Sequence, residues 1–509
     1  MLLYEIIDKI VEENPGKKAV ICGKDSCTYG RLFDRMNLWA KTLLSIGIKR
    51  GDRVALFMKN RVELVQLYFA CFRIGAIAVP LNTRYKTPET IYALKQSGSK
   101  ILIASSDLYP VVENILDNTP SLKHIYIIDE DSKHKSLSWK KATTDSEDHI
   151  NFPEVNISDP AIIIYTSGTT GRPKGAVHSH YSLLNLILNK KKSQEIGQYE
   201  ISLAATQISH IAGFAGLMLT TLSNGGTLVM VSEFNPADYI KCLKKYKPTF
   251  TVLLPTELLE ILEHPNAKDA DFSNLRSMMV AGDKVPHHIY DFFRKLTGFD
   301  LMEGCGMTEC EGYCIQPKNE KKKPGSIGKP ISGVQIRLVD SNGNDVPVGK
   351  TGEIYLKSKS VISNYWNNPE ETKKAFGGEW FRTGDLAYKD EDGYYHFVSR
   401  IKEIIIRGGS NITPGEIEDI LDDYPKVESS GVVGFPDDHY GSIVGAFIVP
   451  KPGMPAPTID ELSAFVSKNL AQYKLPEKWI FVKRLPKNAV GKIDRKELHN
   501  LAEKHISKS

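Results

Sequence analysis

The sequence is poor in cysteine and has no excess of charge of one sign. Seven cysteines in 509 residues, an odd number at irregular spacing, do not form a disulfide framework, which favours a reducing, intracellular setting. The 65 basic and 61 acidic residues leave a formal net charge of +4, so no nucleic acid partner is expected. Glycine (39) and proline (27) occur at ordinary levels, which excludes collagen-like chains. The chain is therefore predicted to be a globular, cytoplasmic protein of several domain-sized units.

Long hydrophobic runs are also missing. Positions 201–232 contain no Asp, Glu, Lys or Arg, but a Ser-Asn-Gly-Gly turn at 223–226 interrupts any span of about 20 residues. This stretch is predicted to form a buried helix, a turn and a buried strand, and no transmembrane segment is expected. The N-terminal segment contains acidic residues from Glu5 onward and lacks a basic region followed by a long apolar run, so it does not resemble a secretory signal. Peripheral membrane contact and the oligomeric state are left open.

The pattern of apolar and polar residues along the chain predicts an α/β fold. Between about 28 and 260, amphipathic helical periods alternate with short apolar runs, which predicts parallel sheets covered by helices on both faces. These runs lie at 53–58, 75–81, 100–105, 161–167, 227–231 and 250–255. After about 325, closely spaced strands at 334–340 and 353–358 predict a small β-barrel-like subdomain. One or two short strands and a helix at 459–470 predict a small α+β C-terminal domain.

The strongest local pattern is the segment from Tyr165 to Gly175, which reads YTSGTTGRPKG and follows an apolar strand. Its glycines permit tight turns and let backbone N–H groups approach an anion. Four hydroxyl side chains can donate to phosphate oxygens, and Lys174 adds a positive charge. No Gly-Lys-Ser/Thr sequence follows the glycines, so this is not a Walker A loop. The segment predicts a phosphate-binding loop of another kind.

Further motifs follow this loop along the chain. They read Gly304-Cys-Gly-Met-Thr-Glu309, Gly325-Ser-Ile-Gly328, Tyr365-Trp-Asn-Asn-Pro369, Trp380-Phe-Arg-Thr-Gly-Asp385, Ser399-Arg-Ile-Lys402 and Gly491-Lys492. With the loop, this set resembles the adenylate-forming superfamily of acyl- and aryl-CoA synthetases, carrier-protein adenylation domains and beetle luciferases. The resemblance covers nearly the whole chain. It implies that a carboxylate attacks the α-phosphate of ATP, and that a thiol, usually that of CoA, then displaces AMP.

The resemblance also implies a domain division and a nucleotide site. A large N-terminal domain (1–400) would bind AMP and the acyl group, and a mobile C-terminal domain (401–509) would carry a catalytic lysine. Glu309 would bind Mg²⁺, which prefers oxygen ligands, and Thr308 would hold the α-phosphate. Asp385 and Arg400 resemble the residues that contact the ribose. The other expected nucleotide-binding residues are Thr166, Ser167, Gly168, Thr169, Thr170, Gly171, Lys174, Gly304 and Cys305.

Three C-terminal positions match the family residues that serve the two half-reactions. Lys492 matches the catalytic lysine that bridges the substrate carboxylate and the α-phosphate. Lys402 occupies the hinge position about which the C-terminal domain would rotate between the two steps. Gly409 matches the glycine beside which the pantetheine arm of CoA would pass, and a tight turn is the alternative role for it.

The acid is inferred from the residues around His210, which matches the family's histidine at the carboxylate end of the acyl pocket. Positions 211–215 are small or apolar, and no aspartate is present to pair an ammonium group, so amino acids are not expected. Ala212 stands where 4-coumarate:CoA ligases carry a tyrosine that can bind the phenol. A medium- or long-chain fatty acid is therefore predicted. The alternatives are an aryl acid, a carrier protein in place of CoA, and an inactive nucleotide- or acyl-binding regulator.

The cysteines near position 310 and the two lysine runs are not predicted to bind a ligand of their own. Cys305 stands where most relatives carry an aromatic residue next to the adenine and acyl pocket. With Cys310 and Cys314 it lacks the CxxC spacing of zinc sites, so these cysteines are predicted to be small residues that line a pocket. The charge runs at 190–192 and 321–323 are predicted to lie in solvated loops.

Overall fold

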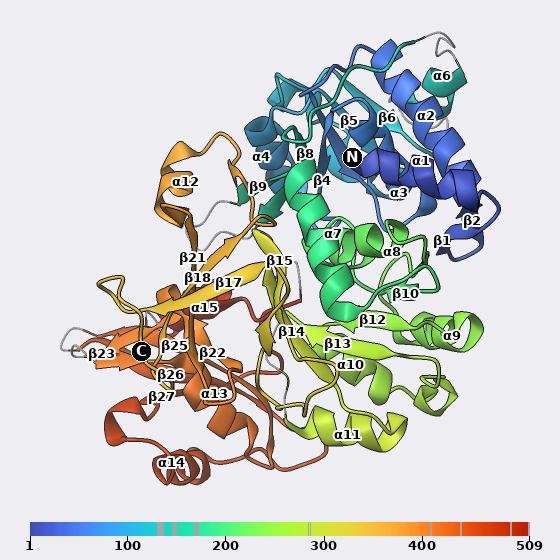
Figure 1. Ribbon diagram of the computed structural model, residues 1–509. Helices are drawn as coiled ribbons and strands as arrows, with labels where there is room; N and C mark the ends of the chain where they lie inside the picture. The colour runs from blue at the N-terminus through green and yellow to red at the C-terminus, as the bar shows by residue number, and fades with distance from the viewer. Residues whose placement is uncertain are drawn as a thin grey trace. The chain divides into compact units, whose positions relative to one another are not determined.

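The computed structural model describes residues 1–129, 137–144, 150–166, 173–282, 285, 287–407, 410–437, 440–488 and 491–506. The chain divides into two compact units. The first unit comprises Met1–Gln335 and Leu356–Phe381, and the second comprises Ile336–Tyr355 and Arg382–Ser509. The first unit carries the two large sheets, and the second carries the two-stranded and three-stranded sheets (Figure 1).

The first unit contains an eight-stranded sheet that is parallel from β8 to β7 and antiparallel at its other edge. In spatial order its strands are β19 (Asn364–Tyr365), β9 (Lys174–Ser179), β8 (Pro160–Thr166), β4 (Ile77–Pro80), β3 (Arg53–Phe57), β5 (Ile101–Ala104), β6 (His124–Ile127) and β7 (Leu137–Ser138). The short strand β19 comes from far along the chain and places Tyr365 opposite Ala176 of β9.

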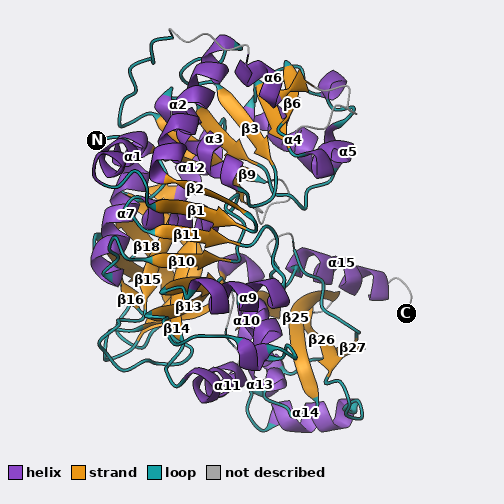
Figure 2. Cartoon of the chain, turned by 90° about the vertical axis from the view of Figure 1, so that its right-hand side faces the viewer, coloured by secondary structure: helices purple, strands orange, loops and turns teal. Residues whose placement is uncertain are grey.

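A nine-stranded sheet completes the first unit, with a parallel centre and antiparallel edges. Its strands in spatial order are β16 (Lys329–Pro330), β15 (Cys310–Ile315), β14 (Met302–Met307), β13 (Ser277–Ala281), β12 (Phe250–Leu253), β10 (Ile201–Ala204), β11 (Thr227–Met230), β1 (Lys18–Cys22) and β2 (Asp25–Thr28). Figure 2 shows its central strands side by side with α9 and α10 alongside them.

Helices cover both sheets. They are α1 (Leu3–Glu13), α2 (Tyr29–Ser45), α3 (Val62–Arg73), α4 (Thr87–Ser97), α5 (Tyr109–Val112), α6 (Trp139–Thr144), α7 (His180–Gln194), η3 (Ala212–Leu219), α8 (Thr220–Leu222), α9 (Pro236–Tyr246), α10 (Pro255–Leu262), α11 (His287–Thr297) and α12 (Pro369–Ala375). Helix α3 contacts β4 of one sheet and β1 of the other. Ten of its 12 residues are buried, as expected for a helix between two sheets.

A five-stranded sheet has the order β17-β18-β21-β20, with β22 paired to β21. The second unit adds a hairpin and a three-stranded sheet in which β25 and β26 are antiparallel. The elements are β17 (Val334–Val339), β18 (Gly352–Ser358), β20 (Phe376–Gly377), β21 (Trp380–Lys389), β22 (Tyr395–Arg400), η5 (Ile401–Glu403), β23 (Ile405–Arg407), β24 (Ser410–Ile412), α13 (Pro414–Asp422), β25 (Val427–Asp437), β26 (Gly441–Pro450), α14 (Ile459–Ser467), β27 (Lys478–Phe481) and α15 (Arg495–Ile506).

The predicted fold class is confirmed, and so are the apolar runs predicted to be strands between 53 and 255. The uncharged stretch 201–232 folds as β10, a buried helical segment, a turn and β11. Among the described residues, no helix is long and apolar enough to cross a membrane. One expectation is wrong: β25 and β26 have 11 and 10 residues rather than being short. Their interior glycines, which weaken the signal of a strand, hid their length.

Gly328, which immediately precedes β16, lies where two backbone segments pack closely together. Its φ is +90°, and a Cβ atom would lie 2.1 Å from the backbone carbon of Ile315. Gly325 has a φ of +79° with nothing within 4 Å of a Cβ. Gly325→Ala should therefore cost only the left-handed backbone strain of about 1–2 kcal/mol, and Gly328→Ala at least about 2 kcal/mol more. Thermal unfolding of the two variants checks this, and equal melting temperatures would contradict it.

Candidate active site

The predicted phosphate loop joins two antiparallel strands at one end of the eight-stranded sheet. Thr166 ends β8 and pairs with Lys174, the first residue of β9. The intervening candidates Ser167, Gly168, Thr169, Thr170 and Gly171 lie outside the described residues. The two strands therefore define where the loop leaves and re-enters the sheet.

Lys174 is held by two side chains of the Tyr365–Ala375 region. Its Nζ donates to Glu371 Oε2 at 2.7 Å and lies 4.7 Å from the centre of the Tyr365 ring. Glu371 is positioned by the start of α12, where the Asn368 side chain accepts from the Glu371 backbone N–H. The hydrogen bond from Lys174, reinforced by Lys374, lowers the pKa of Glu371 to about 2. Near neutral pH this pair is therefore a fixed ammonium–carboxylate contact.

Tyr365 also contacts Glu309, in the short segment between β14 and β15. The Tyr365 hydroxyl donates to Glu309 Oε1 at 2.6 Å, and the Glu309 residue is 7% exposed. Burial, together with the neighbouring Glu309 carboxylate, raises the pKa of Tyr365. Tyr365 therefore stays protonated and donates to a carboxylate while its ring faces Lys174.

Thr308 is fixed through its backbone. His178 Nε2 lies 2.8 Å from the Thr308 carbonyl oxygen, and His178 Nδ1 lies 3.1 Å from Ser182 Oγ. Burial lowers the pKa of His178 to about 4, so the ring is neutral at pH 7. A carbonyl oxygen only accepts, so the proton is on Nε2. A buried strand residue of β9 thus anchors the motif that contains Glu309.

The second unit contains the candidate ribose-binding pair. Asp385 of β21 is directly opposite Arg400 of β22, and Arg400 Nε lies 3.1 Å from Asp385 Oδ1. The Asp385 residue is 4% exposed, and its backbone N–H donates to Thr383 Oγ1 at 3.0 Å. The register of one hairpin thus brings the two predicted residues together.

The remaining C-terminal candidates belong to the second unit. Lys402 is exposed in the short helix η5 directly after Arg400. Lys492 closes a turn in which Asn488 N–H donates to the Lys492 carbonyl at 2.8 Å and Lys492 N–H donates to Asn488 Oδ1 at 3.1 Å. Gly409 lies outside the described residues.

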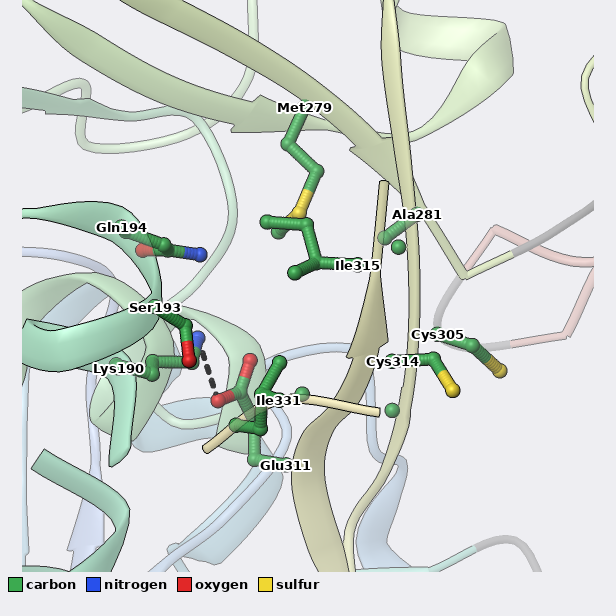
Figure 3. Close-up of a pocket in the computed structure, with 13 residues that line it drawn as sticks. Lys190, Ser193, Gln194, Met279, Ala281, Cys305, Glu311, Cys314, Ile315 and Ile331 are labelled. Carbon is green, nitrogen blue, oxygen red and sulfur yellow. Dashed lines mark ion pairs between the residues drawn. The ribbon is translucent and has the colours of Figure 1, made fainter. Parts of the chain in front are cut away.

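A pocket in the first unit contains the candidates Gly304 and Cys305 (Figure 3). Cys314 lines it too, so the predicted pocket-lining role is confirmed for two of the three cysteines. Cys305 Sγ lies 3.0 Å from the Tyr313 hydroxyl. His210 lies just before η3, and its Nδ1 accepts from the Ala212 backbone N–H at 3.4 Å.

The expectation that residues 190–192 lie in a solvated loop is wrong, because all three lie on α7. Lys191 and Lys192 are exposed, whereas Lys190 is buried and lines the pocket with Glu311. Helical spacing carries the missed signal, because Ile187, Lys190 and Gln194 recur at intervals of three and four on one buried face. Tyr365 was visible only as part of a motif, and His178 gave no signal in the sequence beyond its apolar neighbours.

Two protein-family models match the sequence. The model described as AMP-binding enzyme matches residues 7–366, and the model described as AMP-binding enzyme C-terminal domain matches residues 416–492. The chain therefore belongs to the AMP-binding enzymes, the adenylate-forming superfamily. It is an AMP-forming acid–CoA ligase, which activates a carboxylic acid with ATP as an acyl-adenylate and transfers the acyl group to CoA.

Individual relatives share the fold over its whole length. The chain is 34% identical over 489 residues to a feruloyl-CoA synthase from Amycolatopsis sp., covering 95% of this chain and 96% of the relative. It is 31% identical over 535 residues to a long-chain-fatty-acid–CoA ligase from Bacillus subtilis (strain 168), covering 97% and 94%. The crystal structure of the anthranilate CoA ligase AuaEII in complex with anthranoyl-AMP superposes with a TM-score of 0.91 at 28% identity, covering 100% of this chain and 98% of that one. These three relatives are named for different acids, so the comparisons assign the reaction but no particular acid substrate.

Removing the Tyr365 hydroxyl tests whether it orients Glu309. Tyr365→Phe keeps the ring beside Lys174 but deletes a hydrogen bond to a carboxylate, a contact worth about 1.5–3 kcal/mol. We expect kcat/KM for ATP to fall by about 10- to 100-fold, measured by acid-dependent ATP–pyrophosphate exchange. Tyr239→Phe deletes a buried hydroxyl contact to Thr251 in another part of the unit and serves as the control. Equal losses in the two variants would reject an orienting role.

Proposed function

We propose that adenylation takes place where Lys174, Thr308 and Glu309 meet. The observation that carries this assignment is the network in which one tyrosine, Tyr365, contacts both Lys174 and Glu309. It holds a cation and a carboxylate beside the ends of the predicted phosphate loop. Lys174 would stabilise negative charge on the phosphates, and Thr308 would hold the α-phosphate under attack. Phosphoryl chemistry depends chiefly on such positioning and charge neutralisation.

Mg²⁺ would bind at Glu309. Among the described residues, no group of three or more His, Cys, Asp or Glu side chains is placed to hold a metal. A single oriented carboxylate nevertheless fits Mg²⁺, which typically takes one or two carboxylates and completes its shell with water and substrate phosphates. Glu309 is buried and its Oε1 is held by Tyr365, so it has the donor type and the fixed orientation required. When bound, Mg²⁺ would neutralise phosphate charge.

The second unit would supply the ribose contacts and the mobile lysine. The Asp385 carboxylate would accept the ribose hydroxyls, and Arg400, its ion-pair partner, would contact the same sugar. Lys492 would bridge the substrate carboxylate and the α-phosphate during adenylation. Rotation about Lys402 would then exchange Lys492 for the Gly409 segment beside the pantetheine arm of CoA. This exchange would require a division between domains near residue 400.

Two classes of acid are candidates for the substrate. A medium- or long-chain fatty acid is supported by the apolar residues after His210, of which Ile211 and Phe214 are buried. An aryl acid with a polar substituent is supported by the charged residues Lys190 and Glu311 in the pocket. It also agrees with the likeness to a feruloyl-CoA synthase.

An acid panel with ATP, Mg²⁺ and CoA tests the proposed reaction. The panel runs from acetate to oleate and includes benzoate, cinnamate and 4-coumarate, and AMP release is followed. We expect release only when acid, ATP and CoA are all present. A maximum among fatty acids would support the apolar segment as the main determinant, and a maximum at 4-coumarate would support the charged residues. Acid-dependent pyrophosphate exchange without CoA-dependent AMP release would indicate a carrier-protein acceptor.

Lys492→Ala should separate the two half-reactions. Losing a preorganised cation typically lowers the rate by about 10²–10³, and we expect a loss of this size in pyrophosphate exchange. Thioester formation from supplied acyl-adenylate should fall much less, because that step proceeds without Lys492. Lys483→Ala, at an exposed lysine of the same unit, is the control. Equal losses in both half-reactions would contradict the assigned role of Lys492.

A further inference from the structure

The pocket that contains Gly304 and Cys305 has an accessible side and a buried side. It is lined by residues of α7, β13, β14 and β15 and lies wholly in the first unit. Gly306 is exposed and stands just before Thr308 and Glu309, so this side adjoins the proposed adenylation centre. The opposite side is formed by Lys190, Gln194 and Glu311, which are all buried and which we call the polar floor (Figure 3).

The polar floor has unused hydrogen-bonding capacity. Lys190 Nζ lies 2.6 Å from Glu311 Oε2, and the two side chains are 2% and 8% exposed. Within the part of the chain that the structure describes, Lys190 Nζ and Glu311 Oε2 have no partner except each other, and Gln194 Oε1 has no hydrogen-bond partner. Buried polar atoms are almost always paired, so the unpartnered Gln194 oxygen and the remaining N–H groups of the Lys190 ammonium indicate that a ligand completes them.

The backbone around the polar floor is shaped to admit the ion pair. A Cβ atom at Gly216 of η3 would lie 2.6 Å from Glu311 Oε1 and 3.2 Å from Lys190 Nζ. A Cβ atom at Gly312 would lie 2.8 Å from Lys190 Cε. Any larger residue at either position would displace the charged groups. The pair therefore occupies space that two glycines leave for it.

Charge balance selects the ligand group. Lys190 and Glu311 neutralise each other, so a second carboxylate or an ammonium on the acid would leave a net buried charge. An alkyl end would leave the polar atoms unsatisfied. A hydroxyl is neutral, and it can accept from Lys190 Nζ while donating to an oxygen of Glu311 or Gln194. Met279, Ile315 and Ile331 provide apolar walls for the carbon skeleton that carries it.

We propose that Lys190, Gln194 and Glu311 recognise a neutral hydroxyl group at the end of the acid remote from its carboxylate. This inference rests on the proposed function, and it replaces the plain fatty acid predicted from the residues after His210. A phenol and a terminal alcohol present the same hydroxyl chemistry.

Matched acids that differ only in this hydroxyl test the proposal. The pairs are 4-hydroxycinnamate with cinnamate and 10-hydroxydecanoate with decanoate. We expect the wild-type kcat/KM for the hydroxylated member of at least one pair to exceed that of its partner by about tenfold or more. The pair with the larger ratio distinguishes a phenol from an alkyl alcohol. A wild-type ratio near one in both pairs, or decanoate as the best acid, would overturn the proposal.

A charge-neutral double variant tests the residues. Lys190→Met with Glu311→Gln keeps the side-chain volumes and removes both charges, and we expect it to lower the hydroxyl preference to about twofold or less. Lys426→Met with Glu461→Gln makes the same changes at an ion pair of 2.7 Å in the second unit and should retain the preference. An unchanged preference in the polar-floor variant would overturn the assignment.

Two further measurements distinguish failure of the polar-floor assignment from failure of the proposed function. Gln194→Leu leaves the ion pair in place and should reduce the preference by about threefold through loss of one acceptor, which keeps the test valid if the double variant does not fold. AMP release that is absent with every acid of the wild-type panel would reject the proposed function. AMP release that occurs without any hydroxyl preference would reject only the polar floor.

Discussion

The proposed adenylation site depends on one tyrosine that contacts two charged groups. Tyr365 donates its hydroxyl to the buried Glu309 carboxylate and presents its ring to the Lys174 ammonium. It can do both because β19 pairs with β9, which begins at Lys174. A buried carboxylate without a donor would be strongly unfavourable, so the strand pairing and the orientation of Glu309 stabilise each other. The separation of 56 residues between Glu309 and Tyr365 shows why the sheet has to form before the site exists.

Compensation of buried charge also shapes the pocket that is proposed to bind the acid. Lys190 and Glu311 are far apart in sequence and nearly inaccessible, yet they form a neutral pair that an acid bound in the proposed site would have to accommodate. Gly216 and Gly312 show that the surrounding backbone is arranged around this pair. A pocket of this kind discriminates between acids by the polar groups it leaves unsatisfied rather than by the apolar area that it buries.

Much of this could be predicted from the sequence because apolar runs and ordered motifs are local signals. The strands between 53 and 255 followed from hydrophobic runs, and the Asp385–Arg400 pair lies within two of the motifs. Lys190 was misjudged because it begins a run of three lysines, of which only the first lies on the buried face of α7. The contact between His178 and Thr308 could not be foreseen, since it joins positions 130 residues apart by a side chain and a backbone carbonyl.

The proposed sites of adenylation and of acid recognition share one hairpin. Thr308 and Glu309 lie between β14 and β15, while Glu311 of the polar floor is on β15, two residues after Glu309. A group bound at Glu311 therefore restrains the same segment that places the Glu309 carboxylate. Binding energy from a part of the acid that does not react is then available to order the reacting centre, which raises the rate of adenylation more than the affinity for the acid. On this account a substrate without the hydroxyl loses kcat as well as affinity, because the hairpin is less well ordered when the polar floor is unoccupied.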